Sequence, residues 1–432
     1  MKNLIEKLKE LRTFIILYIT QTFSGLGSAM TSYALVIWSY EQQGSALVTS
    51  LLMVCSYAPY VILSIFAGAL SDRWNKKKVM LVCDSIAAMG TVAILVLLRT
   101  DHLKIWHLYL LNALNGLMNT VQQPASEVAV TRILPKKYYQ KVGALGYFSR
   151  SLNSILTPII ATAILAMTGI NFIIGFDLFT FLVAFCSLLF FIKIPEDNSD
   201  IDKKETVLQA SKKGVEYLKD NKGIRDLIFF LAAINLTASM YQAAFPAMML
   251  SRNGGSEIAL GMVNATIGIT TLVGSIFASL LKAPKSRVKV ICNTLLFSMS
   301  FENFLLALGR STPIWCLGGF LGWILIPVMS TNLEAIMRLK VPVELQGRVF
   351  SARNTLQFFT IPVGYFAGGI LVDKVFEPLM SRVDSDNILI TLFGSGKGSG
   401  AAFLFFILAF SGIASCLYFR RDHNIWELEK EK

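Results

Sequence analysis

Long apolar runs separated by short polar segments recur along the whole chain. Each run has about 20 residues, enough at a rise of about 1.5 Å per residue for a helix to cross a hydrocarbon core roughly 30 Å thick. The pattern therefore predicts a protein made of transmembrane helices. Twelve spans are predicted, near residues 14–40, 46–70, 78–98, 106–130, 148–168, 170–192, 226–250, 257–281, 289–308, 314–337, 349–371 and 400–419.

One long polar interruption, residues 193–227, divides the predicted spans into six and six. Within it Val207, Ala210 and Leu218 recur at helical spacing with lysines on the other face, which predicts an amphipathic helix along the membrane surface. We therefore predict three parts. These are an N-terminal six-helix bundle (1–192), a cytoplasmic linker with the amphipathic helix (193–225) and a C-terminal six-helix bundle (226–432).

Two segments match each other across the predicted halves. "EVAVTRILPKKYYQKV", which begins at Glu127, and "EAIMRLKVPVELQGRV", which begins at Glu334, share Glu, Pro, a basic residue and Val at equal offsets. Both span the inner end of the fourth helix of their half, which indicates an internal repeat. The expected fold is all-α, with two pseudo-symmetric six-helix bundles. Glu127 and Glu334 are expected at the inner gate, near Arg150 and Arg353.

Composition and charge agree with a membrane protein. Hydrophobic residues make up 54% of the chain and charged residues only 16%, against roughly a quarter in soluble domains. Most of the 40 Lys and Arg residues fall in alternate loops, the linker and the termini, so the positive-inside rule predicts that both termini are cytoplasmic in a plasma membrane. Loops that face anionic lipid account for the net charge of +12, and no nucleic-acid partner is expected.

Residues for metal or covalent chemistry do not cluster in the sequence. The six cysteines stand apart within apolar runs, and the three histidines lie at helix ends or in the tail. The segment "GSGKGSG" differs from a phosphate-binding loop because Gly398 follows Lys397 where Ser or Thr should stand, and we interpret it as a flexible joint. We expect no cofactor, no metal and no enzymatic activity.

The loop between the second and third spans carries a family motif. "GALSDRWNKKKVM", residues 68–80, resembles the G-x-x-x-D-R-x-G-R/K-R/K motif of the major facilitator superfamily, and residues 341–373 and 216–227 are similar to its macrolide-efflux and enterobactin-exporter branch. The resemblance implies alternating access by two rocking halves, usually in an exporter that uses the proton gradient. The motif residues are Gly68, Asp72, Arg73, Lys76 and Lys77.

Three positions depart from the family pattern. Asn75 replaces the second glycine of the motif and, as an Asn, tolerates a left-handed turn. Asn115 stands where the family places a basic residue linked to proton coupling, and Thr157 precedes Pro158 in place of a Gly-Pro motif. Asn115 and Thr157 stand at positions that the family uses for proton antiport. These departures therefore weaken the prediction of proton antiport more than the prediction of transport.

Asp72 is the candidate for a gate contact. A carboxylate after the second span would cap the positive N-terminus of the eleventh, which begins near Gly347 and Arg348. Arg73 would extend this contact. The alternative, that the cations only anchor the loop on the inner side, is favoured for Lys77. The predicted gate residues are Gly68, Asp72, Arg73, Lys76, Lys77, Glu127, Glu334, Gly347 and Arg348.

Polar residues recur at helical spacing in several spans, which favours a hydrated cavity because lipid-facing polar groups are costly. Hydrogen bonding between helices is the competing explanation. Amide and hydroxyl groups with aromatic walls and few charges suit a large amphipathic compound. The predicted cavity residues are Gln21, Ser28, Asn112, Asn115, Asn119, Asn153, Asn235, Gln242, Trp323 and Gln357.

Carboxylates within spans are natural proton carriers because burial disfavours their charged form. The candidates are Asp84, Asp177 and Glu302, with an ion pair to the basic loop as the alternative for Asp84. We expect a monomeric exporter of amphipathic, macrolide-like compounds whose partners are its small-molecule substrate, protons and membrane lipids. A siderophore- or lipid-type exporter and a non-transporting receptor are the alternatives.

Overall fold

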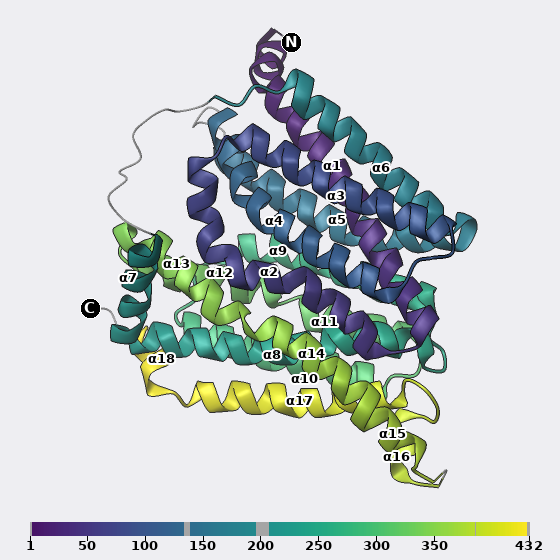
Figure 1. The fold of residues 1–432 in the computed structure, drawn as a ribbon. Helices are drawn as coiled ribbons and strands as arrows, with labels where there is room; N and C mark the ends of the chain where they lie inside the picture. The colour runs from purple at the N-terminus through teal and green to yellow at the C-terminus, as the bar shows by residue number, and fades with distance from the viewer. Residues whose placement is uncertain (1, 134–138, 196–206, 385, 430–432) are drawn as a thin grey trace. The chain divides into compact units, whose positions relative to one another are not determined.

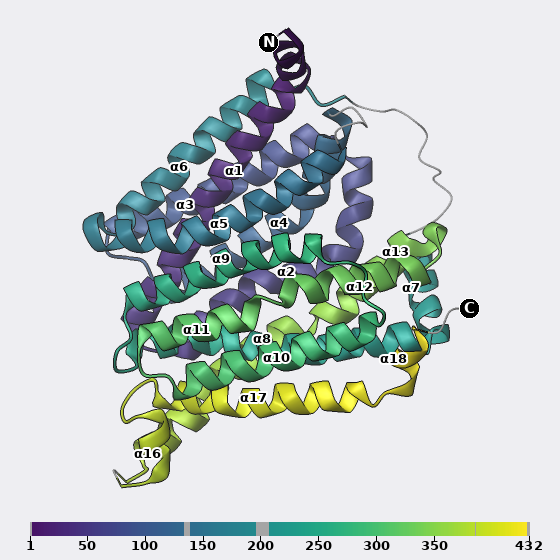
Figure 2. The ribbon, with the colours of Figure 1, turned by 180° about the vertical axis from the view of Figure 1, so that it is seen from behind.

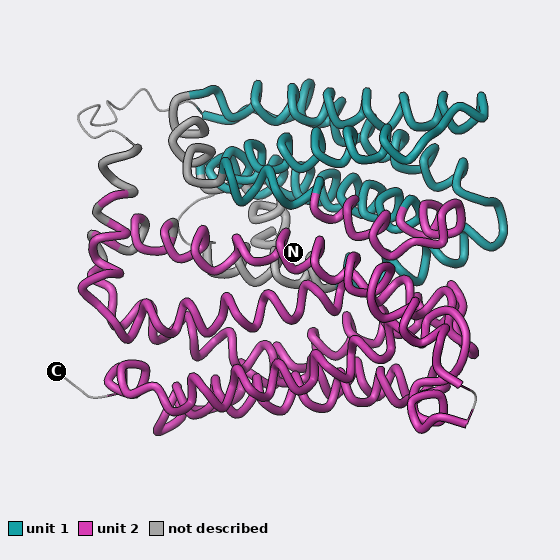
Figure 3. Tube along the Cα trace, turned by 60° about the horizontal axis from the view of Figure 1, so that its bottom comes forward, with its two compact units in different colours: residues 1–35, 55–205 teal, residues 36–54, 206–432 magenta. Residues whose placement is uncertain are grey.

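The computed structural model describes residues 2–133, 139–195, 207–384 and 386–429, and the regular elements in these ranges are all helices (Figures 1 and 2). Contacts within the chain define two compact units, which Figure 3 colours separately. Unit 1 comprises residues 1–35 and 55–205, and unit 2 comprises residues 36–54 and 206–432. The unit boundaries cross the first two helices. The division into two six-helix bundles stays a prediction.

Unit 1 holds the helices of the first predicted half. α1 (Lys2–Gln43) includes the N-terminal segment in one continuous helix, and both α1 and α2 (Ala46–Arg73) extend into unit 2. A short π-helical turn, Ser187–Phe191, ends the sixth helix. The other helices are α3 (Lys76–Arg99), α4 (Ile105–Ile133), α5 (Tyr139–Thr168) and α6 (Ile170–Cys186).

The loop before α3 shows why Asn stands at position 75. Asn75 has φ −61° and ψ 115°, and its side chain accepts a hydrogen bond of 2.8 Å from the Lys78 amide. It is therefore the N-cap of α3, because a short side-chain acceptor satisfies a first-turn amide. The left-handed conformation that Asn tolerates is therefore not adopted at this position. Lys77 Nζ donates to the Leu189 and Ile192 carbonyls at 2.9 and 2.8 Å, which joins the start of α3 to the end of the sixth helix.

Unit 2 begins with the linker helix and holds the second predicted half. Its core is a cluster of buried, mostly aliphatic residues contributed by α7, α8, α10, α12, α13, α17 and α18. The helices are α7 (Val207–Asp220), α8 (Lys222–Ser251), α9 (Glu257–Leu280), α10 (Arg287–Leu308), α11 (Thr312–Trp323), α12 (Ile326–Lys340), α13 (Val343–Phe358), α14 (Thr360–Ile370), the π-helical Leu371–Phe376, α15 (Glu377–Ser381), α16 (Ile388–Phe393), α17 (Ser399–Arg420) and α18 (His423–Glu427).

The tenth and eleventh predicted spans are each interrupted. α11 and α12 are separate helices that meet just before Pro327, and α13 and α14 meet at Phe359, three residues before Pro362. Proline removes a backbone donor and crowds the preceding turn, so breaks at these places follow from the sequence.

Small residues bring two helices of unit 2 together. A Cβ at Gly364 would lie 2.6 Å from the Ser239 Cβ, and one at Gly368 would lie 2.8 Å from the Met240 Cα. The backbones of α14 and α8 are therefore in contact, because no larger residue fits at either position.

The linker helix α7 packs against protein. Leu218 is 2% exposed and belongs to the core of unit 2, and Tyr217 Oη donates to the Lys340 carbonyl at 2.8 Å. Gly214 lies directly against the Arg348 carbonyl. Gly214 and Leu218, the described residues of its apolar face, are thus covered by protein, and a position of the helix along the membrane surface stays a prediction.

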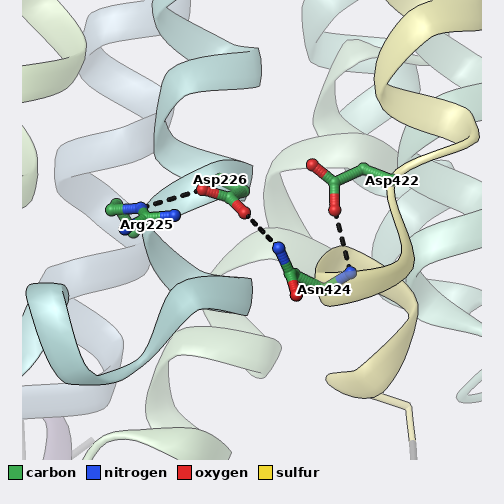
Figure 4. Close-up of polar contacts among 4 residues, drawn as sticks. All are labelled: Arg225, Asp226, Asp422 and Asn424. Carbon is green, nitrogen blue, oxygen red and sulfur yellow. Dashed lines mark hydrogen bonds and ion pairs between the residues drawn. The ribbon is translucent and has the colours of Figure 1, made fainter.

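The C-terminal segment is fastened to the first turns of α8 and α10. Asp226 accepts from Arg225 Nε at 2.9 Å and from Asn424 Nδ2 at 2.8 Å, and Asp422 caps α18 through the Asn424 amide (Figure 4). Glu429 accepts from the Val288 amide at 2.6 Å. The last described residues thus join two helices of unit 2.

Nine helical segments in the described residues are long and apolar enough to cross a membrane. The predicted spans outside this set lie in α1, α4 and α5. α1 and α4 carry the polar stripes noted in the sequence, which lower their mean hydropathy. The count of twelve stays a prediction.

Candidate functional site

Asp84, on α3, collects amide donors from two other helices of unit 1. Gln122 Nε2, from α4, donates to Asp84 Oδ1 at 2.6 Å, and Gln21 Nε2, from α1, lies 3.4 Å from Asp84 Oδ2. The carboxylate is thus held by neutral donors. The alternative role in an ion pair with the basic loop stays a prediction.

Asp177 is the second buried carboxylate of unit 1. It lies on α6, is 4% exposed, and accepts a hydrogen bond of 2.9 Å from Ser28 Oγ on α1. Gly27 makes this approach possible, because a Cβ there would lie 2.5 Å from Thr180 Oγ1 and 2.9 Å from the Asp177 Cα. One predicted cavity residue and one predicted proton carrier therefore meet where α1 crosses α6.

The remaining predicted polar residues of unit 1 have separate environments. Asn112 Nδ2 donates to the Leu108 carbonyl of its own helix at 2.9 Å, and Asn153 Nδ2 lies 3.5 Å from the Thr22 carbonyl. Asn119 is exposed. Asn115 Oδ1 is buried with no hydrogen-bond donor among the described residues.

Glu302 is the buried carboxylate of unit 2. It lies on α10, is 4% exposed, and accepts a hydrogen bond of 2.8 Å from Trp323 Nε1 at the end of α11. The buried Tyr241 of α8 lies beside it. Gly322 makes room for the side chain, because a Cβ at this position would lie 2.7 Å from Glu302 Cδ and Oε2. A neutral indole thus supports the carboxyl group.

Polar contacts also join α8 to the eleventh predicted span. Asn235 Nδ2 donates to the Gln357 carbonyl at 3.1 Å, and Tyr365 Oη donates to Gln242 Oε1 at 3.0 Å. Gln357 Oε1 is buried and has no donor within the described ranges. These residues form hydrogen bonds between helices, which is the competing explanation from the sequence, and their role in a cavity stays a prediction.

Glu334 and Arg353, which the sequence analysis placed together, form an ion pair. Arg353 Nη1 lies 3.0 Å from Glu334 Oε1, and Arg338 Nε lies 3.9 Å from Glu334 Oε2. The pair joins α12 to α13. Its counterpart in the other half, Glu127, is exposed and lies 3.4 Å from Gln123 Nε2 of its own helix.

Several gate residues lie where side chains are not described. The side chains of Gly68, Asp72 and Arg73, together with Gly347 and Arg150, fall outside the described residues. The predicted capping contact of Asp72 therefore stays a prediction. Lys76 is buried and donates to the Trp74 carbonyl at 3.0 Å, and Arg348 is half-buried.

Sequence reasoning missed three polar residues in unit 2. Arg252, which follows α8, is 6% exposed and donates to the carbonyls of Leu306, Ala307 and Phe393 at 2.9, 2.9 and 3.1 Å. Asp373 and Glu377, four residues apart, accept hydrogen bonds from backbone amides of other helices. The signal for the acids was their place directly after an apolar span. For Arg252 the sequence held no signal.

Within the described residues, no cluster of His, Cys, Asp and Glu could hold a metal ion. Asp84, Asp177 and Glu302 have neutral donors and, in this part of the chain, no ion-pair partner. A buried carboxylate without a cation is costly to keep charged, so proton exchange is the chemistry that these groups offer.

Comparison with known proteins identifies the family. The model of the Major Facilitator Superfamily matches residues 17–365, so the chain belongs to this family of multi-pass membrane transporters. Macrolide efflux protein A of Streptococcus pyogenes is 21% identical over 84% of this chain and 90% of its own length. The enterobactin exporter EntS of Citrobacter koseri is 22% identical over 65% of this chain and 66% of its own length.

A solved structure shows the same fold. The crystal structure of the nucleoside transporter NupG superposes with a TM-score of 0.67, covers 94% of this chain and 98% of its own, and is 14% identical. At this identity the likeness concerns the fold alone. It agrees with the all-α fold of the superfamily expected from the sequence.

Replacing Gly322 with Ala is expected to disturb Glu302. The added methyl group would overlap the carboxyl group, so α11 must shift, at a cost of about 1–3 kcal/mol typical of overpacking. We expect a lower melting temperature in detergent. Gly175→Ala, on α6, is the control because a Cβ there meets nothing within 4 Å. Equal melting temperatures for the two variants would contradict this contact.

Proposed function

We propose that the protein is a secondary active transporter that exports amphipathic or hydrophobic, macrolide-like compounds by alternating access in exchange for protons. We further propose that it acts as a monomer in the plasma membrane, surrounded by lipid, with both termini in the cytoplasm. The two predicted six-helix bundles would rock to open the substrate site to one side of the membrane and then to the other.

The buried carboxyl group of Glu302 carries the proposal. The indole N–H of Trp323 donates to it at 2.8 Å, and the buried Tyr241, whose ring packs against Phe245 and Phe405, lies beside it. A group of this kind loses a proton when water or a cation reaches it and regains the proton when it is sealed again. Alternating exposure would therefore couple proton movement to the transport of a second molecule.

The substrate class rests on the relatives and on the polar residues. Macrolide efflux protein A is named for the export of large amphipathic compounds, and it is similar to this chain over most of both sequences. The predicted cavity residues are mostly amides and hydroxyls with few charges, a set that suits a neutral, hydroxyl-rich molecule.

Drug efflux from cells tests this function. Cells that make the protein are loaded with a radiolabelled macrolide or a dye, and the retained amount is followed with and without a protonophore. We expect lower retention than in cells that lack the protein, and we expect the difference to vanish with the protonophore. Equal retention with and without the protein, across the panel, would overturn the export of such compounds, and efflux that survives the protonophore would overturn proton coupling.

A siderophore-type exporter is the second candidate, since the enterobactin exporter is among the relatives. It predicts release of a catecholate siderophore from producing cells in place of macrolide efflux. A receptor that does not transport would show neither activity. Both outcomes can be measured in the same cells.

A further inference from the structure

We propose that Asp373 is the gate residue at the outer end of the transporter, where it holds the first turn of α2 against the end of the eleventh predicted span. The inference rests on the proposed orientation, which places the loop after α1 and the loop after residue 376 outside. Asp373 belongs to the π-helical Leu371–Phe376, and the first turn of α2 belongs to the same compact unit.

The carboxylate of Asp373 caps a helix more than 300 residues away in the sequence. Its Oδ1 accepts from the Ala46 amide at 3.0 Å, and its Oδ2 accepts from the Leu47 amide at 2.9 Å and from Ser45 Oγ at 2.5 Å. The first turn of α2 contains no acidic residue of its own. Asp373 therefore supplies the negative charge that complements the positive end of this helix.

Close backbone packing also joins α14 to α2, one helical turn before Asp373. A Cβ at Gly369 would overlap Ser50 Oγ and would lie 2.8 Å from the Leu47 Cα. Ser50 is fully buried. The end of α14 thus lies directly on the first turns of α2, and Asp373 continues the line of contact.

Glu377 and Asp373 bind different parts of the chain. The Oε1 atom of Glu377 accepts from the amides of Gly398 and Ala401 at 2.9 and 3.3 Å, at the start of α17. This contact lies wholly within the second predicted half, and it anchors the segment that we had interpreted as a flexible joint. Asp373, by contrast, binds residues 45–47, which belong to the first predicted half.

This difference makes Asp373 a gate residue rather than a scaffold residue. α1 and α2 run from this contact into unit 1, whereas α14 and α17 remain in unit 2. In alternating access the outer ends of helices from the two halves separate and rejoin. A carboxylate that binds amides only while these ends are together stabilises the state that is closed on the outside.

Chemical labelling of Ser50 tests the gate. In a Ser50→Cys protein we measure the rate at which a membrane-impermeant maleimide, added from outside, reacts with the introduced thiol, and we subtract the reaction of the parent protein. Adding Asp373→Asn should raise this rate about tenfold or more, because an amide cannot accept from both backbone amides and one charge-assisted contact is worth at least that factor.

Glu377→Gln is the matched control. It removes the same charge four residues away but loosens only the cap of α17, so the labelling rate of Ser50→Cys should stay within about twofold of that of the parent. Thermal melting in detergent verifies that each variant is folded. Equal labelling rates in folded Asp373→Asn and parent proteins would overturn the proposal, as would an equal rise in both variants.

Cross-linking gives a second test. A short bifunctional thiol reagent should bridge Ser45→Cys with Asp373→Cys, stop efflux, and release it after reduction, whereas neither single variant should respond. Full efflux with the bridge in place would overturn the gate. The labelling assay needs neither a substrate nor a proton gradient, so failure of the exporter proposal and failure of the gate can be told apart.

Discussion

Replacing Glu302 with Gln is expected to abolish gradient-driven efflux while the folded protein remains in the membrane. The Gln carbonyl can still accept the hydrogen bond from Trp323 Nε1, now 2.8 Å from the carboxylate, so the local packing should survive. The amide cannot release a proton, so the coupled cycle has no carrier. Exchange of labelled for unlabelled compound across the membrane, which needs no net proton movement, should continue.

The two assays are run side by side on vesicles with an imposed proton gradient. Glu216→Gln, an exposed position on α7, is the control and should leave both activities unchanged. Asp84→Asn and Asp177→Asn test the other two candidate carriers under the same conditions. Gradient-driven efflux that persists in Glu302→Gln would show that this residue is not the carrier.

Replacing Arg252 with Met should cause the largest loss of stability that we predict. The guanidinium donates to three carbonyls, two of them at the C-terminal end of α10, and lies 6.0 Å from the Trp315 ring centroid. Burial, and to a lesser degree the neighbouring Arg310, lowers the pKa of Arg252 to about 10, so the group is still charged at neutral pH. Without the guanidinium of Arg252, the buried carbonyls lose their donors. This loss should lower the free energy of unfolding by about 3 kcal/mol or more.

Thermal unfolding in detergent measures this loss. Arg382→Met, an exposed position in the loop after α15, is the matched control and should change stability by less than about 0.5 kcal/mol. A melting temperature for Arg252→Met equal to that of the control would show that the carbonyls find other donors.

The sequence was most informative where one residue type has one physical consequence. Apolar runs predicted the helices, and the six-plus-six pattern predicted the linker helix between them. The repeated Glu placed Glu334 near Arg353. Each of these features depends on local chemistry or on spacing along one helix.

The contacts of polar residues across helices could not be predicted. Ser28 and Asp177 are 149 positions apart, and nothing in the sequence shows which helices cross at Gly27. Periodicity shows that one face of α7 is apolar but does not show that Leu218 on this face packs into the core of unit 2. The cap formed by Asn75 could not be predicted either, since Asn serves both left-handed turns and helix caps.

The C-terminal contacts bear on how the protein is best handled. Asn424 binds Asp226 near the start of α8 and Glu429 binds the first turn of α10, so an affinity tag joined directly to the C-terminus adds mass beside both contacts. Purification through an N-terminal tag, or through a C-terminal tag placed behind a long Gly/Ser spacer, keeps those ends undisturbed.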